Sequence, residues 1–372
     1  LYRHYLSVDQ VRARYAPTAA DVQAVVKHLE AAGFGQIEVA PNRLLVTAQG
    51  TAGAVKAAFN TGLQRFAFRG REVYANDQPA QVPAALGGIV HAVLGLQDVA
   101  APQILARPAA APKAAGTQAA SGSKIGHNPL DFAKIYNAGS TPTAAQTAVG
   151  IISAGKLDAS LTDLGTFTRA NGLAAVDTLV VKTGRSTDSG YKRANGTTEW
   201  DLDSQDIVAV SGGVKQLIFY DAPSLTYANV TAAFNRAVTD NVAKVINVSL
   251  GSDEASAHSS GTQAADDAVF KVAVAQGQTF SISTGDEGVY ESTGGQVPAD
   301  PSDYSVSEPA SSPYVIAVGG TAVYTTGTTG YAGEEVWNSG LDSSGYLGAT
   351  GGGVSLYEAA PAWQSAARPR RG

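Results

Sequence analysis

The sequence is short of sulfur and of charge. Its 372 residues include no cysteine and no methionine, and only 16% are charged. Because cysteine is absent, disulfide bonds, thiolate zinc sites and cysteine nucleophiles are excluded. Lys and Arg (26) are outnumbered by Asp and Glu (32), so the formal net charge is -6 at pH 7. This balance argues against nucleic acid and anionic membranes as partners. No run of 18 apolar residues occurs, so no segment is expected to span a membrane.

Histidine is also scarce. None of the five histidines has a partner at metal-ligand spacing: His4, His28, His91, His127 and His258. We therefore expect neither histidine catalysis nor a metal site built from residues of this chain. The glycine-rich segments lack the strand–GxGxxG–helix context, which argues against a nucleotide site.

Length and composition predict two domains joined by a linker. The 372 residues are more than one core usually organises, and 44% of them are hydrophobic. Residues 106–126 are rich in Ala, Pro, Gly, Ser and Thr, which is typical of a flexible linker. They separate an N-terminal domain, 1–105, from a C-terminal domain, 127–372. The start at Leu1 and the basic end at 368–372 indicate a processed or trimmed product that is incomplete at its C-terminus.

The N-terminal domain shows the order helix, helix, strand, strand, helix, strand, strand. Ser7 and Thr18 are suited to begin helices, and Gly33 is suited to end the second one. Short alternating segments predict strands at 36–39, 43–47, 64–68 and 72–75. We expect an α+β fold with an antiparallel sheet.

From His127 onward, short apolar β-rich runs alternate with helical segments. The runs are 149–153, 178–182, 215–220, 244–249, 278–283 and 315–318, and helices are expected at 161–171, 230–240 and 264–276. This alternation predicts an α/β fold, with a parallel sheet covered by helices on both faces. Functional groups should then gather at the carboxyl ends of the strands.

The densest acidic cluster lies at residues 199–206. On a helix, Glu199 and Asp203 share a face, so their carboxylates repel unless they share a proton or a partner. A shared proton raises the pKa of one group, which suits acid–base chemistry at low pH. Asp206 could join the same face, and Asp201 should point away. The alternative is a solvated acidic helix start, which the helix dipole favours.

A second candidate is Asp286, in a Gly-rich turn that follows a predicted buried strand. A carboxyl there could be a metal ligand, a nucleophile or, when protonated, a hydrogen-bond donor. The alternative is an ordinary Asp in a turn. A third candidate is the strand that runs into Gly251, although its pattern alone favours a core strand followed by a turn.

Several segments, in order, resemble the sedolisins (serine-carboxyl peptidases) of the pseudomonalisin and kumamolisin type in their proenzyme form. Residues 199–205 look like the Glu-x-x-x-Asp helix of that family, and 245–251 are similar to its strand that lies against substrate. Residues 283–288 resemble the segment that bears the oxyanion Asp, and 309–321 with 350–353 match further landmarks. The likeness covers nearly the whole chain, and residues 1–105 resemble the activation domain.

The resemblance implies a subtilisin-like sheet and a Ser-Glu-Asp triad. A serine would attack the peptide carbonyl, Glu199 would take its proton, and Asp203 would hold and polarise Glu199. The reference pKa of Glu is ~4.3 against ~6.5 for His, so a carboxylate remains a base in acid where His is charged. Asp286 would take the oxyanion position, where it must be protonated to donate a hydrogen bond.

The resemblance also implies a set of substrate-binding residues: Ser249, Leu250, Gly251, Glu308, Pro309 and Ala310. Glu308, before Pro309, is a departure from the family pattern beside the expected pocket wall, and a carboxyl there could favour cationic or protonated side chains. The family further implies a secreted bacterial enzyme that cleaves proteins and peptides and binds calcium, with the calcium ligands outside this chain.

The chain departs from the family at the nucleophile. The Gly-Thr-Ser motif is absent, because Gly320 and Thr321 are followed by Ala322 and the chain ends at Gly372. We expect the nucleophile and the calcium loop beyond Gly372, on a C-terminal fragment of the same protein. The alternative is an inactive relative that acts as a binding or scaffold protein. A histidine-dependent subtilisin is disfavoured, because its Asp loop and its His-Gly helix start are lacking.

Residues 1–105 are expected to be a folding aid and an intramolecular inhibitor that blocks the cleft until acid loosens it. Protonation of carboxylates in the interface would be the trigger. We expect cleavage within the linker, between Ala106 and Lys124.

Overall fold

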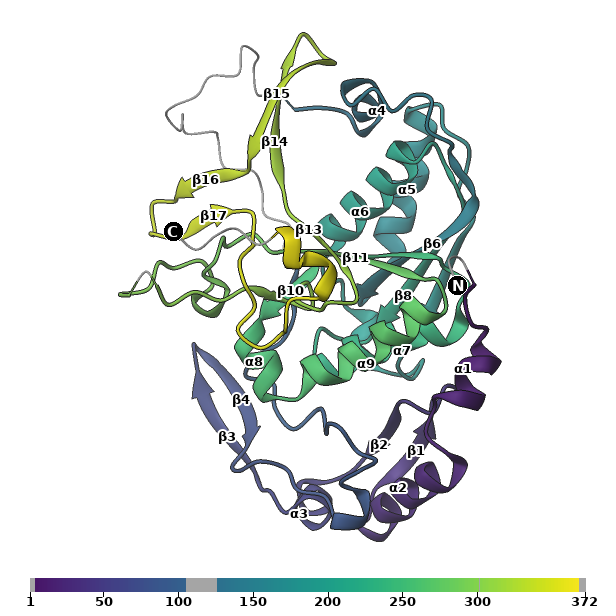
Figure 1. The fold of residues 1–372 in the computed structure, drawn as a ribbon, viewed down its shortest axis with the longest axis vertical. Helices are drawn as coiled ribbons and strands as arrows, with labels where there is room; N and C mark the ends of the chain where they lie inside the picture. The colour runs from purple at the N-terminus through teal and green to yellow at the C-terminus, as the bar shows by residue number, and fades with distance from the viewer. Residues whose placement is uncertain (1–3, 105–125, 301, 368–372) are drawn as a thin grey trace.

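The computed structural model describes residues 4–104, 126–300 and 302–367. Figure 1 shows a small N-terminal region, residues 4–104, that lies against one side of a larger C-terminal region, residues 126–367. Apart from Gly126, the linker expected at 106–126 lies outside the described residues.

Helix caps fix the start of the N-terminal region. Helices α1 (Val8–Arg14) and α2 (Ala19–Ala31) begin with capping boxes at Ser7 and Thr18, in which side chain and backbone satisfy each other's polar groups. The Thr51 hydroxyl caps α3 (Ala52–Phe59) in the same region.

The strands of this region form two separate antiparallel hairpins. Strand β1 (Gly35–Val39) pairs with β2 (Val46–Gln49), and β3 (Leu63–Phe68) pairs with β4 (Arg71–Asn76). The antiparallel pairing is confirmed, but the single continuous sheet that we expected is not formed. Helix α3 lies between the hairpins in the chain, and its Val55 and Phe59 pack with Leu29 of α2 in a small core.

A six-stranded parallel sheet forms the centre of the C-terminal region. Its order is β13-β11-β9-β6-β8-β7, and each of the six runs predicted from the sequence supplies one strand. The strands are β6 (Ala144–Ala154), β7 (Thr178–Lys182), β8 (Val214–Ala222), β9 (Val245–Val248), β11 (Thr279–Ser283) and β13 (Ile316–Val318). The subtilisin-like α/β arrangement is therefore confirmed.

Helices cover both faces of this sheet (Figure 1). Helices α5 (Asp158–Ala170) and α6 (Thr197–Val210) pack together on one face, and α7 (Tyr227–Asp240) and α9 (Thr262–Ala275) pack together on the other. Phe234, Phe270 and Phe280 pack together between the second pair and the sheet, with ring centroids 4.9–5.9 Å apart. Among the described residues, no helix has the length and apolar character needed to cross a membrane.

Shorter elements surround the sheet. They are β5 (Gln103–Ile104), α4 (Phe132–Ile135), β10 (Leu250–Asp253), α8 (Glu254–Ser259), β12 (Ser307–Glu308), β14 (Thr321–Thr326), β15 (Gly330–Val336), β16 (Asn338–Leu341) and β17 (Leu347–Ala349). Single 3-10 turns occur at Ala84–Leu86, Pro129–Asp131, Ser189–Lys192, Glu291–Thr293 and Ala362–Ala367.

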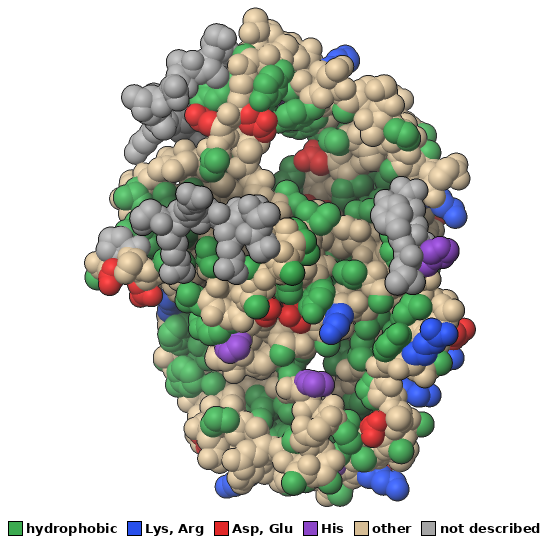
Figure 2. Space-filling model, in the orientation of Figure 1, with side chains coloured by type: hydrophobic (Ala, Val, Ile, Leu, Met, Phe, Trp, Pro, Cys, Tyr) green, Lys and Arg blue, Asp and Glu red, His purple; other side chains and the backbone are tan. Residues whose placement is uncertain are grey.

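The surface in Figure 2 is chemically mixed, with hydrophobic side chains across the middle of the face and Lys and Arg mostly toward its rim. Ile316 and Val318 are exposed on β13, which is an edge strand of the sheet. Exposed apolar side chains on an edge strand are typical of a contact surface.

Uncharged contacts join the two regions where the N-terminal region meets α7 and α9 (Figure 1). Asn42 Nδ2 donates to Asn235 Oδ1 at 2.6 Å, and Asn235 Nδ2 donates back to Asn42 Oδ1 at 3.4 Å. Both side chains are buried. The Leu6 amide also donates to the Ala275 carbonyl at 2.9 Å. A buried amide pair of this kind holds the interface without using charge.

We expect Asn235→Leu to destabilise the protein by about 1–3 kcal/mol, because it leaves the buried Asn42 amide without its partner. Arg236→Ala, at the exposed neighbouring position, removes only an ion pair to Asp240 and should cost less than about 1 kcal/mol. Urea unfolding of the two variants measures the difference, and equal midpoints would contradict the role of the amide pair.

Candidate active site

Helix α6 carries the acidic pair to the carboxyl end of the sheet. It begins after Gly196, whose φ of 82° is in the left-handed region. The fully buried Trp200 fixes its first turn, because the indole Nε1 donates to the carbonyls of Asn195 at 2.6 Å and Ala154 at 3.3 Å. Ala154 is the last residue of β6. The acidic pair therefore lies near the carboxyl end of a central strand, where functional groups were expected.

Glu199 and Asp203 are both buried, with 3% and 8% of their surface exposed. Ser249 Oγ donates to Asp203 Oδ1 at 2.7 Å, and Asn247 Nδ2 donates to Ser249 Oγ at 3.2 Å. Burial, followed by the negative charge of Glu199, raises the pKa of Asp203 to about 8. The alternative of a solvated acidic helix start is therefore wrong, because both carboxyls are removed from water.

Two further carboxyl groups, those of Asp201 and Asp206, lie on the same helix as this pair. Asp201 interacts with Ser160 and Asp163 of α5, so it faces away from Asp203 as expected, and burial raises its pKa. Asp206 adds a small further electrostatic contribution to the raised pKa of Asp203. Glu199 and Asp203 are thus the two carboxyls of the acidic cluster that are buried together, and their catalytic role stays a prediction.

Asp286 lies beyond the end of the neighbouring strand β11. Gly285 has a φ of 93°, and its carbonyl accepts a hydrogen bond from the Gly351 amide at 2.8 Å. A Cβ at Gly351 would stand 1.6 Å from the Thr284 carbonyl oxygen, so only glycine fits there. The Ala349 amide donates to the Asp286 carbonyl at 2.9 Å. Gly351, the first residue of the triple glycine 351–353, thus packs against the turn that presents Asp286.

Neighbouring strands place Asp286 and Ser249 at the same sheet edge. Ile282 of β11 lies beside Val248 of β9 in the parallel pairing, and the two chains continue from there into Asp286 and Ser249. Ser249 was predicted to contact substrate, and the structure shows its hydroxyl bound to Asp203. This contact was not visible in the sequence, because it joins residues 46 positions apart.

The strand predicted to lie against substrate already has a peptide strand beside it. On one side of β10, Leu250 pairs with Ile104 and Gly251 with Gln103 in antiparallel register. On its other side, Ser252 pairs with Glu308 of β12. The end of the N-terminal region therefore occupies an edge of the candidate substrate strand.

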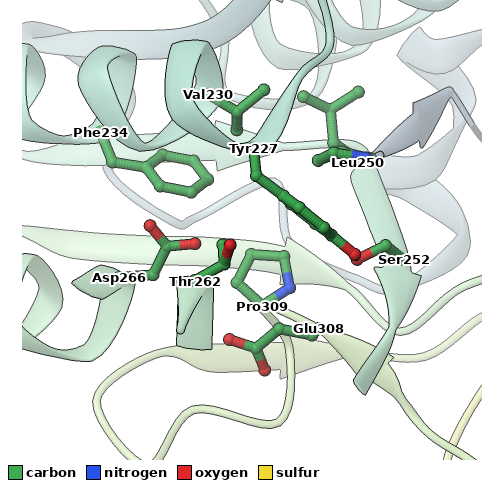
Figure 3. Close-up of a pocket in the computed structure, with 10 residues that line it drawn as sticks. Tyr227, Val230, Phe234, Leu250, Ser252, Thr262, Asp266, Glu308 and Pro309 are labelled. Atoms are coloured by element: carbon green, nitrogen blue, oxygen red, sulfur yellow. The ribbon is translucent and has the colours of Figure 1, made fainter. Parts of the chain in front are cut away.

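A small pocket lies next to this pairing (Figure 3). Helix α7, helix α9, strand β10 and the β12 segment line it, together with the end of the N-terminal region: Pro102, Tyr227, Val230, Phe234, Leu250, Ser252, Thr262, Asp266, Glu308 and Pro309. Glu308 and Pro309 were predicted to contact substrate, whereas Ala310 packs in the main core. Asp266 was not singled out, because in the sequence it looks like any polar residue of a helix.

No group of three or more His, Asp or Glu is arranged to hold a metal ion within 4–104, 126–300 and 302–367. The calcium ion that the resemblance implies has no fitting ligand set there, and it stays a prediction.

A parallel sheet with an acidic pair at its carboxyl edge, and a peptide strand beside β10, defines the class of subtilase-like peptidase folds. A model of the subtilase family matches residues 194–339, and a model of the pro-kumamolisin activation domain matches residues 1–99. The N-terminal region is therefore a prosegment of the activation-domain type.

Individual relatives narrow the class further. Sedolisin from Pseudomonas sp. (strain 101) is 54% identical over 97% of this chain and 62% of its own length. Xanthomonalisin from Xanthomonas sp. (strain T-22) is 52% identical over 98% of this chain and 48% of its own length. This chain thus spans about half to two thirds of these relatives.

A solved structure agrees with these relatives. Pseudomonas sedolisin, a serine-carboxyl proteinase solved in complex with two molecules of pseudo-iodotyrostatin, matches with a TM-score of 0.63 and 55% identity, over 66% of this chain and 67% of the sedolisin chain. The chain belongs to the sedolisin family.

The buried carboxyls predict a protein that becomes more stable as the pH falls. Burial raises the pKa of Asp203 and Asp266 to about 8 and that of Asp221 to about 7, from 3.8. Between the two values the folded state binds more protons than the unfolded state, so the free energy of unfolding decreases as the pH rises from about 4 to 8. Thermal unfolding measured across this range should show the midpoint falling as the pH rises.

Asp203→Asn separates this effect from general changes, because the amide cannot ionise. The variant should unfold at a higher temperature than the parent near pH ~8 and lose that advantage near pH ~4. Asp158→Asn, which removes an exposed carboxyl from α5, is the control. Parallel midpoint curves for Asp203→Asn and the parent would contradict the raised pKa.

Proposed function

We propose that the protein is the precursor of a secreted, acid-acting serine-carboxyl endopeptidase. The observation that supports this most is the buried Glu199–Asp203 pair, with Asp203 held by Ser249 at 2.7 Å at the carboxyl edge of the sheet. Its relatives include a protein described as a serine-carboxyl proteinase. In the whole protein, a serine from the part that these relatives have and this chain does not span would supply the nucleophile.

In the proposed reaction, Glu199 acts as the base. It takes the proton from the serine hydroxyl while the serine oxygen bonds to the peptide carbonyl carbon, and it returns that proton to the leaving amine as the C–N bond breaks. Water then repeats the sequence on the acyl-enzyme. Asp203, whose pKa of about 8 keeps it protonated in acid, would donate a hydrogen bond that orients Glu199 and stabilises its charge.

Asp286 would stabilise the negative charge that develops on the carbonyl oxygen. It would do so as a protonated carboxylic acid, because only that form donates a hydrogen bond. Its turn is held by backbone hydrogen bonds to Ala349 and Gly351, so the donor is positioned before the reaction begins. The activity should therefore disappear as the pH rises and Asp286 ionises.

The prosegment would inhibit by occupying the substrate strand. Its residues Gln103 and Ile104 make the antiparallel pairing with β10 that a substrate would make. Hydrogen bonds between uncharged groups also join the regions, namely the Asn42–Asn235 amide pair and the Leu6 amide to the Ala275 carbonyl.

The carboxyls beneath the prosegment end do not supply an acid trigger for release. Burial raises the pKa of both Asp266 and Glu308, so their protonation favours the state in which they stay covered. Acid release, followed by cleavage between Ala106 and Lys124, would have to depend on other groups.

We expect Glu199→Gln to reduce peptidase kcat about 10²–10⁴-fold, because it removes the base. Asp286→Asn should reduce kcat about 10²–10³-fold through loss of oxyanion stabilisation, unless its amide replaces the donor, in which case Asp286→Ala is decisive. Cleavage of a denatured protein near pH ~4 measures both.

The protein for this assay would include the part that the relatives have and this chain does not span. Asp158→Asn is the control, because its exposed carboxyl lies on the outer helix α5. Full activity in Glu199→Ala would reject the proposed mechanism, and no cleavage by the parent at any acidic pH would reject the proposed function.

We expect Ile104→Asp to loosen the prosegment end, because it places a charge where an aliphatic side chain packs against the main core. Gln103→Asp changes the adjacent, exposed position and should have little effect. Limited proteolysis at neutral pH should cut Ile104→Asp near residues 101–104 several-fold faster than the parent. Equal cutting rates for the two variants would show that the strand pairing does not depend on Ile104.

A further inference from the structure

The prosegment contributes to the lining of the pocket shown in Figure 3. Pro102 lines it, directly before the two residues that pair with β10. Side chains alternate along a strand, so Pro102 and Ile104 face the enzyme while Gln103 faces away. Ile104 packs against Gly196, where an added Cβ would stand 2.3 Å from its Cδ1. Under the proposed function, a substrate residue would take the place of Pro102 in this pocket.

One side of the pocket is apolar and the other is acidic. Figure 3 shows Tyr227, Val230 and Leu250 on one side, and Asp266 and Glu308 on the other. The Tyr227 hydroxyl is turned toward Ser252 Oγ and donates to it at 3.0 Å. The pocket therefore combines an apolar wall for a side-chain stem with carboxyls suited to a polar tip.

The carboxyl groups of Asp266 and Glu308 are buried, and one oxygen of Glu308 lacks a hydrogen bond among the described residues. Asp266 and Glu308 are only 3% and 2% exposed. Thr231 Oγ1 donates to Asp266 Oδ1 at 2.6 Å, and Ser311 Oγ donates to Glu308 Oε2. Glu308 Oε1, in contrast, is buried without a hydrogen-bond partner among the described residues. A cavity of about 10 Å³ remains in the pocket, which is roughly the space that one water needs.

The ionisable groups around the pocket are mostly carboxyls. Asp266, Asp267 and Glu254 each act electrostatically on Glu308. Glu254 accepts hydrogen bonds from Gln263 Nε2 at 3.2 Å and from the Leu356 amide at 3.2 Å. Ser312 Oγ donates to Asp267, and Lys271 is the cation that acts on this carboxyl.

Glu358 and His258 also act on these carboxyls or on each other. Burial, followed by the charges of Asp267 and Glu254, raises the pKa of Glu358, and His258 acts on it in the opposite direction. His258 stacks on Tyr357 at 4.0 Å, and its Nδ1 lies 2.8 Å from Gln263 Oε1. Carboxyls thus outnumber the cations that act on them, and a positive charge would be favoured in the pocket.

We propose that this pocket selects a lysine or arginine side chain of the substrate, at the position that Pro102 occupies in the precursor, with Glu308 and Asp266 as the specificity-determining residues. The stem of the side chain would lie along Tyr227, Val230 and Leu250. Its cationic tip would fill the water-sized cavity and donate a hydrogen bond to Glu308 Oε1. On binding, the proton of Glu308 passes to solvent and leaves an ion pair. Pro102 makes no such contact, so it is the weaker occupant.

The precursor allows this proposal to be tested without enzymatic activity. Residue 102 lines the pocket, so a substitution there should change how firmly residues 103–104 stay paired with β10. Pro102→Lys and its uncharged match Pro102→Met are each made in the parent and in Glu308→Gln. Hydrogen exchange of residues 103–104 then measures how often the strand leaves β10. Near pH ~7, Pro102→Lys should exchange about tenfold more slowly than Pro102→Met, because of the ion pair. In Glu308→Gln the two should exchange at similar rates.

Equal rates for Pro102→Lys and Pro102→Met in the parent would overturn the proposal. The proposal would also be overturned if Pro102→Lys still exchanged about tenfold more slowly than Pro102→Met in Glu308→Gln. Should Glu308→Gln fail to fold, Asp266→Asn removes the second carboxyl and keeps the cycle decisive.

A second measurement uses the processed enzyme and two peptides that differ only by Lys or Met at this position. The ratio of their kcat/KM values should favour Lys, rise with pH as Glu308 ionises more readily, and fall toward one in Glu308→Gln. An enzyme that cleaves both peptides equally would overturn the specificity but not the proposed function. If neither peptide is cleaved, the proposed function fails, and the exchange measurement still decides the chemistry of the pocket.

Discussion

Removing a carboxyl group from water costs far more free energy when the group is ionised than when it is protonated. Much of this protein depends on that constraint, because Asp203, Asp266 and Glu308 are all buried. Burial raises the pKa of each, so each prefers to carry a proton. A fold of this kind is suited to acid: the groups that chemistry needs as donors keep their protons there, and the fold loses least stability.

The site and the fold were predictable to different extents. The six parallel strands could be read from the sequence because each is a short apolar run between helical segments. Glu199 and Asp203 could be paired because helical spacing alone brings them to one face. The two prosegment hairpins were not separable, because alternation predicts strands but not which of them share a sheet. The contacts of Ser249 and Asp266 were also hidden, since they join distant positions through the fold.

The join between the prosegment and the peptidase region has two physical components. One is the uncharged packing of the N-terminal region on α7 and α9, with the Asn42–Asn235 amide pair. The other is the pairing of Gln103 and Ile104 with β10. Amide pairs and strand hydrogen bonds do not titrate in acid, so protonation does not by itself break these contacts. Under the proposed function, cleavage of the linker would then be the step that changes the strength of inhibition.

If the pocket selects a basic residue as proposed, covalent attachment would explain why a neutral residue at position 102 is sufficient in the precursor. While the chain is intact, the prosegment end is held near β10 at an effective concentration of about millimolar, so even a modest fit keeps the strand in place. Under the proposed function, cleavage of the linker would remove that advantage and leave only the non-covalent contacts, which are the packing on α7 and α9 and the pairing of Gln103 and Ile104 with β10. A proline that leaves Glu308 Oε1 without a partner has little intrinsic affinity for an acidic pocket. A substrate with a basic side chain there would then displace it, and inhibition would end with cleavage without any rearrangement of the site.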